Sequence, residues 1–151
     1  MFERYLKDTV QEDAHIIKAL LEHSHIDEIE IQLLENLVSF LCTGASSCID
    51  DYYQRIIKIR NEANSIFKNI SSDIIDSSIE KHRQLDFLVL DRKIEQISSL
   101  TLTSAQSIRV LTKVDTTLHT SLQPNALSIM TLILSMHQKF KTALDDFHHN
   151  K

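Results

Sequence analysis

Histidine and carboxylate side chains are the groups in this sequence best suited to metal binding or proton transfer. The chain contains eight histidines. Glu12 and His15 form a Glu-x-x-His unit, which places two metal ligands on one helix face in di-iron carboxylate bundles. Such a centre also needs ligands from other helices, and we do not expect that set here. We predict that His15 is a boundary residue of the first helix.

His15 also permits an interpretation as a phosphate acceptor. The segment from His15 to Ala19 is similar to the pattern of histidine phosphotransfer domains, in which an exposed helical histidine is followed three residues later by lysine and then by glycine. Lys18 matches this pattern, and Ala19 stands in place of the glycine. A phosphotransfer module is therefore kept as an alternative function.

Nucleophilic catalysis finds no support in the motifs of the chain. A phosphate-binding loop or a nucleophile elbow needs several glycines, and the sequence contains only Gly44. We therefore predict no catalytic residue, no cofactor and no enzymatic activity.

The elements that position these residues are predicted to be helices. The chain has 151 residues, of which one is glycine and one is proline, and a β protein needs those residues for its turns. Apolar residues recur at helical spacing nearly throughout. A chain of this size can bury one self-sufficient core. We predict an all-α, antiparallel bundle of about five helices in a single domain.

The interruptions in the apolar pattern predict where the helices end. We expect an extra N-terminal helix within residues 1–26, with a turn from Ser24 to Asp27, then a core over 27–114 and a last helix over 124–147 that opens at Pro124. A break after residue 70 should be followed by a helix that begins between 79 and 85. Either Gly44 or the Asp50-Asp51 pair could form another break, and we favour Asp50-Asp51 because aspartate caps helices well. Met130 and Met136 are expected in the core.

Charge and hydropathy exclude two classes of partner. Residues 1–51 carry 11 acidic residues against 3 basic ones, whereas residues 52–151 carry 10 against 13, and no basic run provides a footprint for nucleic acid. The acidic N-terminal part should instead pack against a basic surface, either of this chain or of a partner, and a solvated acidic face is the alternative. The uncharged stretch from Thr116 to His137 includes Pro124, and its strongly apolar part is too short for a membrane span.

Two cysteines without a signal peptide favour a cytoplasmic location.

Several short segments share a pattern of helices joined by acidic turns, and they are Leu33-Leu34-Glu35, Asp51-Tyr52, Ile59 to Ile66, Gln84 to Leu90 and Ile94 to Ser99. Through these segments, residues from Leu33 to about Ser107 resemble the PhoU-like family of putative phosphate transport regulators. The resemblance implies a helical bundle, a role in regulating phosphate uptake, and pairs of carboxylates four residues apart that hold metal ions.

The chain departs from the family at the positions that the resemblance assigns to metal ligands. The first pair reads Arg60 and Asn64, and the second reads Glu95 and Ser99. We predict that no metal is bound and that Arg60 forms an interhelical ion pair with Glu95. A metal-binding bundle remains the alternative, and its ligands would be the following acidic residues: Glu62, Asp86, Asp91 and Glu95.

The resemblance also bears on assembly and partners. Family members resemble a duplicated arrangement of about six helices, and this chain offers one family-like core. Half of a pseudo-symmetric bundle leaves an apolar face to cover. We therefore predict a homodimer with the last helix as its interface, and binding to a transporter or sensor protein.

Overall fold

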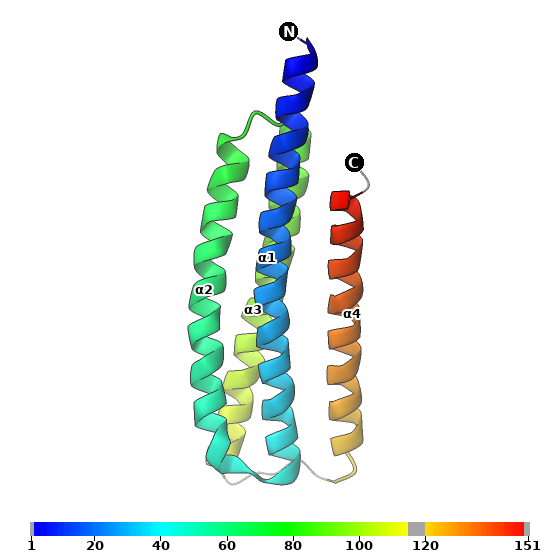
Figure 1. Ribbon diagram of the computed structural model, residues 1–151. Helices are drawn as coiled ribbons and strands as arrows, with labels where there is room; N and C mark the ends of the chain where they lie inside the picture. Colours follow the sequence, from blue (N-terminus) through cyan, green and yellow to red (C-terminus); the bar gives the residue numbers. More distant parts are fainter. Residues whose placement is uncertain (1, 115–119, 150–151) are drawn as a thin grey trace.

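The computed structural model describes residues 2–114 and 120–149, with side-chain surroundings from residue 11 onward except at Ser46. It is an all-helical bundle of four long helices: α1 (Phe2–Thr43), α2 (Ile49–Asp76), α3 (Lys81–Lys113) and α4 (Gln123–His149). A short 3-10 helix, η1 (Ser46–Cys48), connects α1 to α2, and the described residues form no strand. Consecutive helices run in opposite directions, and the N-terminal end of α1 extends beyond the others (Figure 1).

The first helix is continuous across the predicted turn from Ser24 to Asp27, so the expectation of about five helices and of a separate N-terminal helix over 1–26 is wrong. These residues are helical, and the apolar positions Ile17, Leu20 and Ile31 are buried on both sides of them. No glycine or proline interrupts the segment. The polar side chains of Ser24 and Asp27 would favour a turn in an isolated peptide. In the bundle they face the interior, and packing against the other helices overrides their preference for a turn.

The break between α1 and α2 lies at Gly44, and the prediction of a break at Asp50-Asp51 is wrong. Gly44 has a φ of 74°, a left-handed conformation that costs glycine little because it has no Cβ. The amide of Ala45 then donates to the carbonyl of Phe40, which closes the end of α1. Asp50 and Asp51 lie in the first turn of α2, where carboxylates interact favourably with the helix dipole.

Later boundaries agree more closely with the sequence pattern. Helix α2 continues to Asp76, so the predicted break after residue 70 begins six residues too early. Helix α3 begins at Lys81 within the predicted window, and α4 begins at Gln123 with Pro124 in its first turn. The predicted loop from Thr116 falls largely outside the described residues. None of the described helices has the length and apolar character needed to cross a bilayer.

Two apolar clusters occupy the two ends of the bundle. One cluster includes Leu37, Ile56 and Ile108, and the other includes Ile17, Ile74 and Ile94. Between them α1 and α3 bury polar residues, so the interior changes from apolar to polar and back along the bundle axis.

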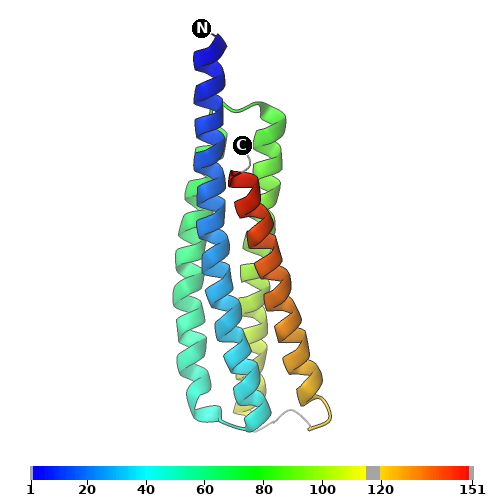
Figure 2. The ribbon, with the colours of Figure 1, turned by 45° about the vertical axis from the view of Figure 1, so that its right-hand side comes forward.

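Helix α4 is the least enclosed helix. It packs against α1, and within the described parts of the chain its contact with α2 and α3 is marginal at most. Figure 2 shows α4 crossing beside α1 with its other side open. Met130 is buried as predicted, but Met136 is 62% exposed, so its placement in the core is wrong.

Candidate functional site

Helix α1 carries three polar residues on its buried face. His23, Asp27 and Glu30 are spaced by four and three residues, which places them on one side of a helix. All three are fully buried. Burying a carboxylate is costly unless it is paired, hydrogen-bonded or protonated, so this placement requires a chemical explanation.

Helix α3 presents a set with the same spacing. Asp91, Glu95 and Ser98 again occupy positions separated by four and three residues. Asp91 and Ser98 are fully buried, and the Glu95 side chain is 17% exposed. We call these six residues together with Arg60 of α2 the polar core.

One end of the polar core is organised around Asp91. Its Oδ1 lies 2.8 Å from His23 Nδ1, and its Oδ2 accepts a hydrogen bond of 3.2 Å from Ser71 Oγ. The other ring nitrogen of His23, Nε2, is 3.8 Å from Glu95 Oε2 and has no hydrogen-bond partner. The imidazole therefore lies between two carboxylates of α3.

The predicted interhelical ion pair between Arg60 and Glu95 is present. Nη1 of Arg60 donates to Glu95 Oε2 at 2.8 Å, and Nη2 donates to Oε1 in a second, shorter contact. Nη1 also donates to Ser98 Oγ at 3.2 Å, and Ser98 Oγ donates to Glu30 Oε2 at 2.5 Å. The hydrogen bonds that Arg60 donates to Glu95 are the main cause that raises the pKa of Arg60. Three helices are thereby joined through one guanidinium.

Asp27 and Glu30 carry carboxylate oxygens of the polar core that lack hydrogen-bond partners. Neither oxygen of Asp27 has a hydrogen-bond partner, and Glu30 Oε1 also has none. Burial, followed by repulsion from Glu30, raises the pKa of Asp27 to about 8. Burial also raises the pKa of Glu30 to about 7, against the lowering effects of Ser98 and Arg60. Near neutral pH this pair is therefore poised to bind or release protons.

A second polar contact ties α4 to α1. His137 is buried, and its Nε2 donates to the carbonyl oxygen of Ser24 at 2.8 Å while lying 3.3 Å from Ser24 Oγ. Burial lowers the pKa of His137. One turn along α4, Lys141 forms an ion pair with Glu28. Asp13 of α1 likewise contacts Arg83 of α3 at 2.5 Å. Acidic residues of α1 therefore pair with basic residues of this same chain.

Two of the predicted candidate residues lie away from the polar core. Glu62 and Asp86 are exposed on α2 and α3, whereas Arg60, Asp91 and Glu95 are inside. The predictions missed His23, Asp27 and Glu30, because Ser24 to Asp27 was interpreted as a turn. A polar set spaced by four and three residues within an apolar stripe was the signal that could have identified them.

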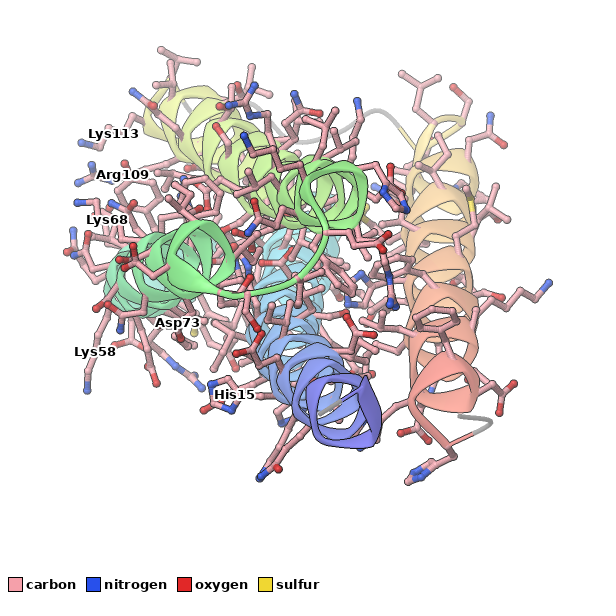
Figure 3. The ribbon with its side chains drawn as sticks, turned by 90° about the horizontal axis from the view of Figure 1, so that it is seen from above. His15, Lys58, Lys68, Asp73, Arg109 and Lys113 are labelled. Atoms are coloured by element: carbon pink, nitrogen blue, oxygen red, sulfur yellow. The ribbon has the colours of Figure 1, made fainter. Side chains whose placement is uncertain are left out.

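His15 belongs to a different part of the surface. Its side chain is 70% exposed, and its Nε2 lies 3.8 Å from Asp73 Oδ2. Both residues line an open cleft of about 540 Å³ between α1 and α2, and Figure 3 shows them on neighbouring helices. A second Glu-x-x-His unit, Glu22 and His25, lies on the same helix as the first and is exposed. It therefore cannot supply the opposing half of a di-iron centre.

The described residues contain no group of three or more His, Cys, Asp or Glu side chains already arranged to hold a metal ion. Searches of family models, curated proteins and solved structures found no match to the chain. The interpretation of function therefore depends on the geometry and on the residues themselves.

Proposed function

We propose that this protein is a non-enzymatic regulatory or accessory protein that acts by binding other proteins through its helical surface. The observation that carries this proposal is the apolar surface on α3 and α4. Monomeric proteins rarely leave large contiguous apolar patches exposed, and such patches commonly mark binding sites. The exposed residues are Leu85, Val89, Leu100, Val110 and Leu111 on α3, and Leu127, Ile129, Leu132, Ile133 and Met136 on α4.

Three of these residues form a line along α3. Val89, Leu100 and Leu111 are eleven residues apart, which is close to three helical turns, and they are 52%, 67% and 42% exposed. Figure 3 shows that the labelled basic residues, Lys58 and Lys113 among them, project on the side of the bundle away from α4. The apolar line on α3 can accept an amphipathic segment of a partner, which would dock by its own apolar side chains.

The resemblance to PhoU-like proteins assigns this binding to the regulation of phosphate uptake, with a transporter or sensor protein as the partner and PhoU-like architecture as the fold. Two free cysteines, Cys42 and Cys48, support a reducing cytoplasmic setting. The proposal further includes a homodimer, and nucleic acid is not among the proposed partners.

Phosphate uptake by cells that lack this protein tests the proposal. Complementation with the wild-type chain should restore the response of uptake to external phosphate, and the variant Leu100→Glu/Leu111→Glu should fail to restore it while keeping its helical circular dichroism. The control is Gln54→Glu, which adds a charge at an exposed polar position of α2, away from the apolar line on α3. Uptake that is unaffected by loss of the protein would contradict a role in phosphate regulation.

A second candidate function is metal binding in the polar core, and the unpartnered carboxylate of Asp27 is the observation that favours it. Asp27, Glu30, Asp91 and Glu95 place four carboxylates in the polar core with the single guanidinium of Arg60, and a cation would have to draw them together from their present arrangement. Hard divalent cations prefer such oxygen ligands. A bound cation would replace the protons that otherwise neutralise Asp27 and Glu30.

Elemental analysis separates the two candidates. The untagged protein would be dialysed against manganese or zinc, freed of unbound metal and analysed by plasma mass spectrometry. A metal-binding function requires about one equivalent per chain, with loss of that metal in Asp27→Asn and retention in the exposed control Asp86→Asn. Protein without bound metal, or equal metal content in both variants, would contradict the second candidate.

A further inference from the structure

Helix α4 carries two apolar stripes, and the fold covers only one of them. The inner stripe includes Met130 and Leu144, which are buried against α1 together with His137. The outer stripe consists of five residues separated by four, three, four and three positions, which is the spacing of a seam between paired helices. Its members are Ile129, Ile133, Met136, Phe140 and Ala143.

The outer stripe is largely open to solvent. Ile129, Ile133 and Met136 are 57%, 37% and 62% exposed, and Ala143 is also exposed. Phe140 is partly buried against the apolar cluster that contains Leu144. Because α4 has at most marginal contact with α2 and α3 in the described parts of the chain, no second helix of the same chain covers this seam.

Charge is distributed unevenly along α4. Residues 123–138 contain no Asp, Glu, Lys or Arg, and the four charged residues of the helix follow in its C-terminal half. They are Lys139, Lys141, Asp145 and Asp146. Parallel pairing of two copies would place each of these charges beside its own counterpart. Antiparallel pairing of two α4 helices that cross near Gln138 would instead place Lys141, Asp145 and Asp146 opposite the uncharged half of the other helix, and only Lys139 would lie near its own counterpart.

We propose that the outer stripe of α4 pairs with the α4 of a second copy in an antiparallel, two-fold interface centred near Gln138. This register places Met136 opposite Phe140 of the second copy, and Ile133 opposite Ala143 of the second copy, so apolar side chains meet apolar side chains along the seam. The inference rests on the proposed protein-binding function and specifies its partner for this helix. A two-fold contact uses the same patch on both chains, and an uncharged patch avoids self-repulsion in a chain whose net charge is −5.

The oligomeric state of the full chain provides the first test. Light scattering at micromolar concentration should give the mass of a dimer for the wild type and of a monomer for Met136→Glu, because a buried charge on both sides of the two-fold would oppose association. Ser135→Glu is the matched control, since it adds the same charge at the neighbouring exposed position off the stripe. A monomeric wild type, or a dimer unaffected by Met136→Glu, would overturn the proposal.

Disulfide trapping tests the register. In a background with Cys42→Ser and Cys48→Ser, the variants Ile133→Cys and Ala143→Cys would be oxidised separately and as a mixture. The proposed register predicts covalent dimers in the mixture and none in either variant alone, because a disulfide requires Cα atoms within about 7 Å. Covalent dimers formed by each variant alone would show parallel pairing and overturn the register.

The outcomes also distinguish this inference from the proposed function. A monomeric wild type whose phosphate response is abolished by Leu100→Glu/Leu111→Glu would overturn the α4 pairing alone. A dimer that is trapped as expected, without any phosphate phenotype, would support the pairing and overturn the phosphate role.

Discussion

Arg60 of α2 and Glu95 of α3 form a two-pronged ion pair whose side chains are only 16% and 17% exposed. The same guanidinium reaches Ser98, which in turn donates to Glu30 of α1. The pair therefore lies at the junction of three helices. Planar, two-pronged contacts of arginine with carboxylates are both directional and strong, so this junction helps to fix the relative register of α1, α2 and α3.

Removing one member of this pair should destabilise the bundle by leaving the other charge poorly compensated. We expect Arg60→Ala and Glu95→Ala each to lower the free energy of unfolding by roughly 3 kcal/mol. The double variant should lose less than the sum, with a coupling above about 0.5 kcal/mol in chemical denaturation. The exposed pair formed by Arg109 and Asp50 is the control and should show much weaker coupling. Additive losses at Arg60 and Glu95 would contradict the structural role of the pair.

Asp27 should make the stability of the protein depend on pH in a defined direction. Its pKa rises from 3.8 to about 8 on folding, so between these values the folded state holds a proton that the unfolded state has released. The contribution of Asp27 to the free energy of unfolding should therefore be fully present below about pH 4, decrease as pH rises, and be lost above about pH 8. The slope from this group is on the order of 1 kcal/mol per pH unit.

The variant Asp27→Asn isolates this effect, because asparagine remains neutral. Denaturation at pH 5, 6.5 and 8.5 should show a smaller decrease of stability with pH than in the wild type. Asp86→Asn, at an exposed position, should leave the pH dependence unchanged. Identical slopes in the wild type and Asp27→Asn would show that Asp27 does not carry the proton.

His137 should control the attachment of α4 to α1. Its Nε2 donates to the carbonyl of Ser24 in a buried contact, and its truncation would remove that hydrogen bond at a cost of about 0.5–1.5 kcal/mol. We expect His137→Ala to accelerate amide hydrogen exchange in α4 and to change that of α2 and α3 much less. Gln138→Ala, at the next and exposed position, is the control. Uniform acceleration in all helices would show instead that α4 opens only with the whole bundle.

Acid should weaken the packing of α4 against α1 by protonating His137. Burial lowers the pKa of this imidazole, so below the ordinary value of 6.5 the unfolded state takes up a proton that the folded state resists. The contribution of His137 to stability is therefore present above pH 6.5 and lost as pH falls through the lowered pKa. Hydrogen exchange of α4 compared at pH 7.5 and 5.5, corrected for intrinsic rates, should show this loss, and His137→Gln should not. An equal pH effect in both proteins would contradict it.

Gly44 should be needed for the end of α1. Its φ of 74° disfavours any residue with a Cβ, so Gly44→Ala should lower the free energy of unfolding by about 1 kcal/mol. Gly44→Asn should cost less, because asparagine tolerates the left-handed region better. Thermal or chemical denaturation measures both changes. An alanine variant as stable as the wild type would show that the backbone at Gly44 readily adopts another conformation.

Local sequence was sufficient for the helical class and for some of the helix boundaries. The scarcity of glycine and proline and the helical spacing of apolar residues predict an all-α bundle, which the structure confirms. The window for the start of α3 and the position of Pro124 follow from local preferences alone. The pairing of Arg60 with Glu95 was predicted from the resemblance to PhoU-like proteins, which implied that these two positions face each other on neighbouring helices.

The tertiary structure decided the remainder. Ser24 to Asp27 have the local character of a turn, yet Asp27 is buried and Ser24 contacts His137, so packing between helices keeps α1 continuous. Likewise, only the packing of the other helices around α3 decides that the face carrying Asp91 is buried. Sequence spacing shows which residues share a helix face, but the arrangement of all four helices determines which faces are enclosed. That arrangement buries Asp27 and leaves Met136 exposed.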